Sequence, residues 1–236
     1  MEIFIKNNKG KIMKKLSLVA LLALGTLGSA STIQASELEI SGNIGAASNY
    51  IWRGMTQTQD KSSVNGGADL KYNGFYTGAW ASNVDFGTQA NFEVDGYVGY
   101  SNTINDFLFD FSYTKYMYPD SHDSSDFDEA KIALGYTLGD LTLGTSYSDT
   151  MYKEAGGAKP SYVDGTVSYD FKILSLDTSY GDYEDMGSNY TVGVSKSVKI
   201  EGQAIKLALV YASFNSDDKD VYKDEKNLFA TAKYSF

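Results

Sequence analysis

The residues that could carry out covalent chemistry gather in one polar segment, residues 119–126. It contains His122, the only histidine of the chain, among serines and aspartates, so a Ser–His–acid triad can be composed from it on paper. Such a triad also needs a nucleophile on a sharp turn and an oxyanion hole, and the segment has the pattern of neither. A solvated loop is the simpler interpretation. We therefore predict no enzyme activity, no catalytic residue and no cofactor.

Acidic side chains in and after the same segment could in principle bind calcium, because hard cations take several carboxylate ligands. Their spacing does not fit an EF-hand loop, and acidic loops are usually only solvated. The glycines form neither a phosphate-binding loop nor a dinucleotide fingerprint. We predict no metal and no nucleotide site. The four acids are Asp120, Asp123, Asp126 and Asp128.

The amino-acid composition excludes several classes of protein. The chain has 236 residues, no Cys, 2 Pro, 23 Gly and 19 Tyr, and its net charge is -10. Without cysteine there can be no disulfide and no thiolate metal site. The acidic balance argues against nucleic acid as a partner, since that needs a basic surface. No apolar run reaches the 18 residues of a helical membrane span, which leaves a membrane β-barrel open.

The N-terminal residues have the pattern of an export signal. Lys14 and Lys15 precede an apolar stretch of about a dozen residues, which small and polar residues follow as far as Ala35. We predict a signal peptide over residues 1–35 and a mature domain over residues 36–236. Cleavage after Ala30, translation from Met13 and an uncleaved anchor helix are the alternatives. The mature chain then has 15 basic and 29 acidic residues, a net charge of -14.

From residue 37 onward, apolar and polar residues alternate with period two, which indicates strands. Each segment has about 10 to 15 residues, longer than most strands of soluble sheets and long enough for a tilted strand to cross a bilayer. The fold class predicted is all-β, an antiparallel transmembrane β-barrel of about 12 strands. The segments are 38–52, 63–72, 75–86, 91–101, 106–118, 127–138, 141–150, 161–171, 173–182, 189–198, 203–214 and 227–236.

Short and long connections alternate along these segments, as in outer-membrane barrels with short periplasmic turns and long outer loops. Asn73-Gly74 indicates a type I′ hairpin, although a three-residue loop would suit the parity of the next strand better. Tyrosines cluster near segment ends, where amphipathic rings meet a membrane interface. Tyr50 and Trp52 are counted among these interfacial rings.

Phe236 ends the alternating last strand, and such an aromatic terminus is typical of the signal that the barrel-assembly machinery recognises. If the apolar parity faces outer-membrane lipid, the other parity faces a lumen. Among the charges then inside are the pore-lining candidates Arg53, Asp69, Glu93, Asp95, Asp110, Glu129, Asp164 and Asp177.

Arg53, the sole arginine, either pairs with a luminal acid near the mouth of the pore or snorkels at the interface. The parity assignment also places Glu39 and Asp85 inside, against the bases Lys71, Lys131, Lys206 and Lys233. The excess of acids predicts a cation preference. Lys115 and Lys196 fall on the apolar face and do not fit the assignment.

Several short stretches within residues 41–119 carry a family resemblance. They are Ser48-Asn49-Tyr50, Arg53-Gly54, Thr56-Gln57, Gly66-Gly67 with Asp69, Gly74-Phe75-Tyr76, Gly78, Trp80-Ala81-Ser82-Asn83-Val84-Asp85-Phe86, Glu93, Asp95, Tyr97, Gly99-Tyr100 and Tyr118-Pro119. With these stretches, residues 41–119 resemble the TorF family of proteobacterial outer-membrane porins. The resemblance implies an exported barrel, and the family's name points to a role near the respiration of small organic oxides. It supplies no catalytic residue.

The function predicted from these features is a porin-like channel in the outer membrane for passive diffusion of small solutes. Three alternatives stay open: a closed structural or adhesin-like barrel, a barrel enzyme that modifies lipid, and a soluble β-sandwich.

Overall fold

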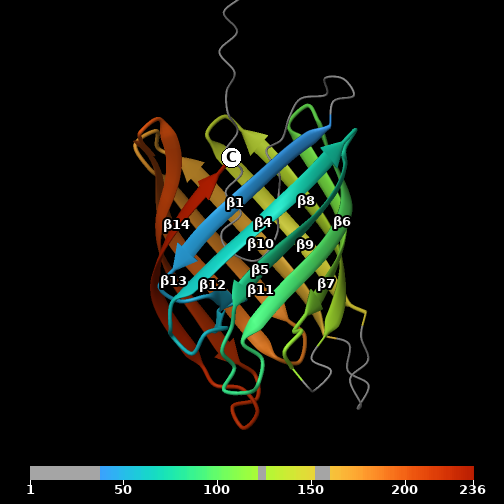
Figure 1. Cartoon of the computed structure of the whole chain (residues 1–236), viewed down its shortest axis with the longest axis vertical. Coiled ribbons are helices and arrows are strands. Elements are labelled where there is room, and N and C mark those ends of the chain that lie inside the picture. Colours follow the sequence, from blue (N-terminus) through green and yellow to red (C-terminus); the bar gives the residue numbers. More distant parts are fainter. Residues whose placement is uncertain (1–37, 122–125, 152–159) are drawn as a thin grey trace, which may run out of the picture.

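A computed structural model of the chain describes residues 38–121, 126–151 and 160–236. The predicted signal peptide, His122 and Asp123 lie outside these residues. The described part is a closed antiparallel β-barrel of twelve strands (Figure 1), which confirms the predicted fold class. Among the described residues no helix is long and apolar enough to cross a membrane.

Each strand of the barrel pairs with its neighbour in the chain, and the last strand pairs with the first. The strands are β1 (Glu39–Ala47), β4 (Ser63–Tyr72), β5 (Phe75–Asn83), β6 (Phe92–Ile104), β7 (Phe107–Met117), β8 (Phe127–Leu138), β9 (Leu141–Thr150), β10 (Ser161–Asp170), β11 (Ser175–Tyr183), β12 (Gly187–Ile200), β13 (Gln203–Ser216) and β14 (Glu225–Ser235).

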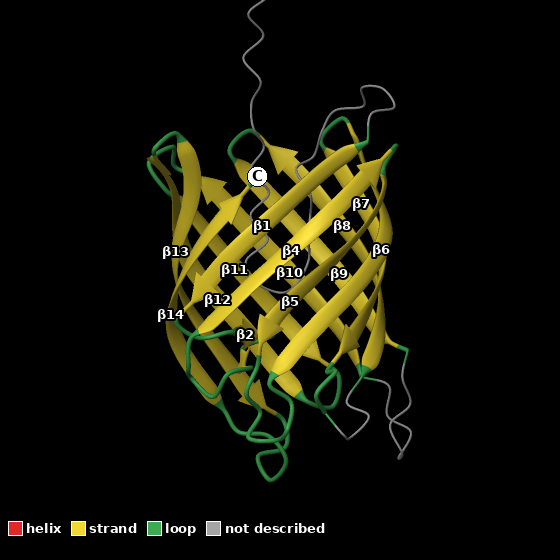
Figure 2. Ribbon diagram, in the orientation of Figure 1, coloured by secondary structure: helices red, strands yellow, loops and turns green. Residues whose placement is uncertain are grey.

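The predicted alternation of connections holds except between β11 and β12, where the loop 184–186 has three residues, fewer than the four of the turn 171–174. Short turns join strands at the end of the barrel where the C-terminus lies, and the other, longer loops lie at the opposite end (Figures 1 and 2). Asn73-Gly74 forms a two-residue turn, because Tyr72 pairs with Phe75 across it. Both turn residues have positive φ, 51° and 85°, as a type I′ turn requires.

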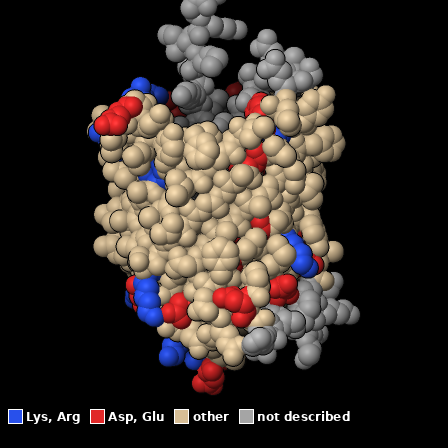
Figure 3. All heavy atoms as spheres, in the orientation of Figure 1, with Lys and Arg blue, Asp and Glu red and all other residues tan. Residues whose placement is uncertain are grey.

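The barrel has the reverse polarity of a water-soluble protein. Large apolar side chains such as Ile40, Val64 and Leu209 are exposed on the outside, whereas charged side chains such as Asp110 and Asp177 are buried inside. In the space-filling view, charges lie mainly toward the two ends of the barrel (Figure 3). A water-soluble sheet packs its apolar face against a core, but this barrel turns that face outward.

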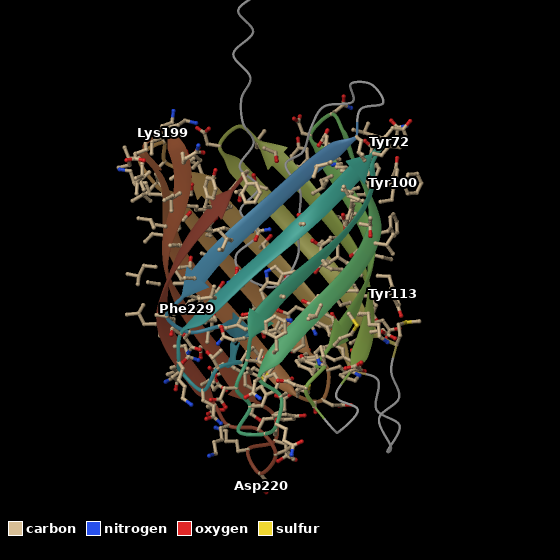
Figure 4. The ribbon with its side chains drawn as sticks, viewed as in Figure 1. Tyr72, Tyr100, Tyr113, Lys199, Asp220 and Phe229 are labelled. Atoms are coloured by element: carbon tan, nitrogen blue, oxygen red, sulfur yellow. The ribbon has the colours of Figure 1, made fainter. Side chains whose placement is uncertain are left out.

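Tyrosines follow the two rims of the outer surface. Tyr72 and Tyr100 project outward near the rim with the short turns, and Tyr113 projects outward toward the other rim (Figure 4). Lys115 also faces outward, and its Nζ lies 3.6 Å from Oδ1 of Asp128 on the neighbouring strand. The strand register is therefore regular at Lys115, and an outward ion pair explains why this lysine departs from the parity.

The barrel closes where β14 meets β1. Asn43 to Ala47 pair with Ser235 to Thr231, and Gly42 and Phe236 add two backbone hydrogen bonds of 2.8 and 3.0 Å. The Phe236 ring lies against Gly42, so closely that a Cβ on Gly42 would lie 2.8 Å from it. The last residue of the chain is thus part of the seam.

Candidate constriction inside the barrel

The segment between β1 and β4 differs from the prediction. The first strand ends at Ala47 rather than at residue 52, and residues 49–58 of the following segment fold into the barrel, whereas residues 59–62 are exposed. Within this segment, β2 (Ile51–Trp52) pairs with β3 (Met55–Thr56) to form a hairpin near the long-loop end of the barrel (Figure 2). Tyr50 and Trp52, expected at the membrane interface, therefore lie inside. That expectation was wrong, because the alternating pattern continues from the strand into the hairpin.

Arg53 and Gly54 form the two-residue turn of the hairpin. Their φ values of 49° and 84° again fit a type I′ turn, which needs positive φ at both positions. Gly54 also approaches the wall closely at β12 and β13, since a Cβ there would lie 2.8 Å from Cβ of Asn189 and 2.8 Å from the Ser213 carbonyl oxygen. Glycine is thus required both by the turn and by the close contact.

The Arg53 guanidinium forms a bidentate ion pair with Glu129 on β8. Its two terminal nitrogens donate to the two carboxylate oxygens at 2.8 and 2.9 Å. Each side chain is only 5% exposed. The Tyr116 hydroxyl also donates to Glu129, at 3.3 Å. Planar bidentate geometry is the strongest form of this pair, and its burial protects it from screening.

Three aromatic rings surround the same guanidinium. Its central carbon lies 4.3 Å from the ring centroid of Trp52, 4.1 Å from that of Tyr162 and 4.8 Å from that of Tyr183. Tyr162 is on β10, which β11–β14 separate from β1 and β5–β9 separate from β4. The hairpin therefore reaches across the lumen to the wall opposite its own strands.

Two further contacts hold the hairpin. Ile51 packs in a buried apolar cluster with Val210, Ala212 and Phe229 of β13 and β14. The backbone N–H of Thr56, in β3, donates to the side-chain carboxylate of Glu225, the first residue of β14, at 2.8 Å. The hairpin is thus fixed to several parts of the wall.

A second cluster of buried apolar side chains packs on the other side of the hairpin. Tyr50 packs with Val84, Ala90, Tyr116 and Tyr118, and its hydroxyl donates to Glu93 at 3.2 Å. Burial raises the pKa of Tyr50 well above its ordinary value, and the nearby carboxylate charges raise it further. The phenol therefore stays protonated and serves as a donor.

A cavity of about 120 Å³ lies beneath the hairpin, with Ile51, Arg53 and Gly54 forming one of its boundaries. Its remaining boundary includes small and hydroxyl side chains of β8–β12, such as Ala133, Thr166 and Ser179, and apolar side chains of β7, β13 and β14. Three charged residues, Lys131, Asp164 and Asp177, also line it. The spacing between neighbouring strands is fixed, so the wall cannot move inward where its inward side chains are small. The space that these side chains do not fill remains as the cavity.

The other predicted pore-lining residues all have their side chains on the inner face, each with its own contacts. Glu93 and Asp95 are 2% and 1% exposed, and neither oxygen of Asp95 has a hydrogen-bond donor among the described residues. The remaining four accept hydrogen bonds from hydroxyl groups: Asp69 from Tyr97 at 2.5 Å, Asp110 from Tyr76 at 2.9 Å, Asp164 from Ser146, and Asp177 from Ser168 at 2.5 Å.

Asp85, which the parity placed inside a strand, lies beyond the end of β5. Lys61 donates to its carboxylate at 2.6 Å. That hydrogen bond, with a second from the Gly87 N–H, lowers the pKa of Asp85. Among the described residues, no group of three or more acidic or histidine side chains is arranged to hold a metal ion.

Sequence reasoning missed the hairpin and the aromatic side chains that receive it. Gly54, between the short strand-forming pairs Ile51-Trp52 and Met55-Thr56, was the one local signal for a tight turn. The contributions of Tyr162 and Tyr183 could not be found locally, because they come from strands distant in the sequence.

A family model described as "Bacterial protein of unknown function (Gcw_chp)" matches residues 31–235. The chain belongs to the Gcw_chp family. Membership in this family does not establish the TorF resemblance of residues 41–119. A search of curated proteins finds no match to the chain.

Solved structures with a similar fold are outer-membrane porins. The KdgM porin matches with a TM-score of 0.58 and 13% identity over 83% of this chain and 99% of that chain. The KdgM porin in complex with disordered oligogalacturonate matches with a TM-score of 0.51 and 11% identity, over 83% and 95% of the two chains. At such identities the likeness between these porins and the Gcw_chp chain concerns the fold.

A larger porin shows a weaker likeness. OccAB4 of Acinetobacter baumannii matches with a TM-score of 0.46 and 10% identity. The alignment covers 77% of this chain and 54% of that one, so the chain spans about half the length of OccAB4.

Proposed function

We propose that this protein is an outer-membrane channel through which small solutes diffuse passively. The observation that carries the proposal is the reversed polarity of a closed barrel, with apolar side chains outside and charged side chains inside. An apolar outer surface suits lipid, and a charged interior suits water and solutes. The porin fold of the similar structures supports the same assignment.

Export and assembly are part of the proposal. Residues 1–35 act as the signal peptide, and cleavage follows Ala35. Phe236, in the seam, serves as the terminal aromatic that the barrel-assembly machinery recognises. The resemblance of residues 41–119 to the TorF porins supports this placement. The proposal contains no catalytic step.

The hairpin of residues 51–56 forms the constriction of the proposed channel. It crosses to the far wall and lies over the cavity, so solutes must pass beside it. Only small solutes fit such a path. The chain of the similar KdgM complex is a porin with oligogalacturonate, but at 11% identity we transfer no substrate from it.

We further propose that the channel prefers cations. Of the charged residues that the strand parity places inside, Asp85 lies beyond the end of β5, which leaves eight acids and five bases, and the ion pair with Arg53 neutralises Glu129. Asp69 and Asp164 lie on the inner face with no lysine or arginine within ion-pair distance among the described residues. Their field in a low-dielectric wall attracts cations. The eight acids are Glu39, Asp69, Glu93, Asp95, Asp110, Glu129, Asp164 and Asp177, and the five bases are Arg53, Lys71, Lys131, Lys206 and Lys233.

Recording from the purified protein in planar bilayers tests both parts. The expected result is unitary current steps, with a reversal potential under a KCl gradient on the cation-selective side. A bilayer that carries the protein without steps would favour the alternative, a closed structural barrel whose lumen the hairpin fills. Steps with anion selectivity would overturn the cation preference alone.

A further inference from the structure

The cage around the Arg53 guanidinium belongs mostly to the barrel wall. Tyr162 comes from β10, Tyr183 from the end of β11 and Glu129 from β8, whereas only Trp52 comes from the hairpin that carries Arg53. Without the hairpin, the wall would still present the Glu129 carboxylate flanked by the ring faces of Tyr162 and Tyr183. This arrangement is chemically a receptor for a cation.

The wall part of the cage is held in place without Arg53. The Tyr162 hydroxyl and the Asn189 side chain are hydrogen-bonded at 3.0 Å, and the Tyr116 hydroxyl donates to Glu129 at 3.3 Å. The Tyr162 and Tyr183 rings pack edge to face, with centroids 5.7 Å apart. Groups fixed in this way lose little freedom when a ligand binds, which favours affinity.

The composition of the cage selects a class of ligand. Aromatic faces attract cations through the negative charge of the ring face, and a carboxylate accepts two parallel N–H donors, one on each oxygen. Guanidinium groups satisfy both requirements, and ammonium groups satisfy the first. A neutral solute of the same shape gains neither interaction.

We propose that Glu129, Tyr162 and Tyr183 form a binding site for the guanidinium or ammonium group of a solute, and that Arg53 is the tethered occupant of this site. A solute cation that enters the lumen competes with Arg53 for the carboxylate and the two rings. When it wins, the hairpin loses its contact with the far wall. The inference rests on the proposed channel function only where it concerns the path of the solute.

Arg53 competes with a free cation from within the same chain. A group attached in this way acts at an effective concentration of about millimolar or more, so a weak free cation does not displace Arg53 from the wild-type protein. The site should therefore be measured first in a variant without the occupant. Arg53→Ala empties the cage while keeping the three wall residues.

The test uses the mature chain folded in detergent, with folding checked by heat-modifiable migration on a gel. Methylguanidinium chloride is titrated by calorimetry, with N-methylurea as the neutral probe of similar shape. We expect Arg53→Ala to bind methylguanidinium saturably in the millimolar range, at least ten-fold more tightly than N-methylurea. The wild-type protein should show no saturation over the same range.

Second-site variants locate the binding. Glu129→Gln in the Arg53→Ala background should weaken methylguanidinium binding at least ten-fold. The matched control is Asp110→Asn in the same background, because Asp110 is equally buried but is bonded to Tyr76 elsewhere on the wall. Arg53→Gln, which keeps a donor for Glu129 without the charge, replaces Arg53→Ala if the latter does not fold.

Equal binding of methylguanidinium and N-methylurea, or binding that survives Glu129→Gln, would overturn the inference. Calorimetry does not require conduction, so its outcome is separate from that of the proposed function. Current steps together with a cage that binds nothing would leave the channel and remove the site. Binding without current steps would leave the site and remove the channel.

Discussion

Arg53 and Glu129, 76 residues apart in the chain, meet across the interior of the barrel through two parallel hydrogen bonds of 2.8 and 2.9 Å. The pair joins the inward hairpin to a strand on the far side. It therefore fixes the hairpin to that wall, and its removal is the most direct perturbation of the proposed constriction.

Glu129→Gln should loosen the hairpin. The substitution leaves a buried guanidinium without its counter-charge, and breaking one partner of such a pair costs about 3–5 kcal/mol. We expect a lower temperature for the loss of heat-modifiable migration and larger or noisier unitary currents. Replacing both partners by apolar residues, Arg53→Met with Glu129→Leu, should recover most of the stability, because no charge is then left unpaired. Stability and current both equal to those of the wild type would contradict this role of the pair.

Gly54→Ala should displace the hairpin tip. The new Cβ adds strain at a φ of 84° and would lie 2.8 Å from both Asn189 Cβ and the Ser213 carbonyl oxygen. Gly139→Ala is the matched control, since its φ is also positive, 62°, but nothing lies within 4 Å of its added Cβ. The strain is common to both variants and costs roughly 1 kcal/mol.

Unitary conductance and thermal stability separate the two effects. Gly54→Ala should change the conductance and be less stable than Gly139→Ala, because, of these two glycines, only Gly54 is pressed against the barrel wall, at β12 and β13. If both variants behave alike, the close approach of Gly54 has no consequence for the channel.

Asp69→Asn and Asp164→Asn should each reduce the cation preference. These acids have no ion-pair partner among the described residues, so each neutral variant removes one uncompensated charge from the inner face. The reversal potential under a KCl gradient should move toward zero, and the difference from the wild type should grow on dilution as the Debye length increases from about 8 Å. Asp85→Asn, in the exposed pair with Lys61, is the control and should leave the reversal potential unchanged.

Deleting Phe236 should lower the amount of folded barrel in the outer membrane. The deletion removes two backbone hydrogen bonds to Gly42 and the ring that lies against it. Phe236→Ala keeps the backbone bonds and removes only the ring, which is 71% exposed and thus able to meet a recognition partner. If the aromatic ring is the signal, the two variants should have similar yields of heat-modifiable barrel. A wild-type yield from Phe236→Ala would assign the effect to the backbone of the seam.

The barrel could be predicted from the sequence because every strand carries its own period-two pattern. The segments 127–138 and 141–150 agree with β8 and β9 to the residue, since a clear turn separates two regular alternations. The predicted bounds of the first segment, 38–52, were wrong because of the same kind of pattern. Ile51 and Trp52 continue the alternation of β1, and nothing in the pattern distinguishes a strand in the wall from a short strand inside it.

The constriction could be predicted only in part. Parity alone placed Glu129 and Arg53 inside, but their pairing depends on the direction in which the hairpin folds. Tyr162 and Tyr183 looked like ordinary strand tyrosines, because their role comes from a residue more than a hundred positions away. Contacts between distant strands depend on the closed ring and leave no local trace.

The seam of the barrel has a mechanical consequence. Five residue pairs and the added Gly42–Phe236 contact join β1 to β14, whereas fourteen pairs join β12 to β13. Because the ladder bonds share any load that separates two strands, the ring opens first where the fewest bonds resist. The wall of this protein therefore has a built-in line of weakness between its first and last strands, where it would unzip before any other junction gives way.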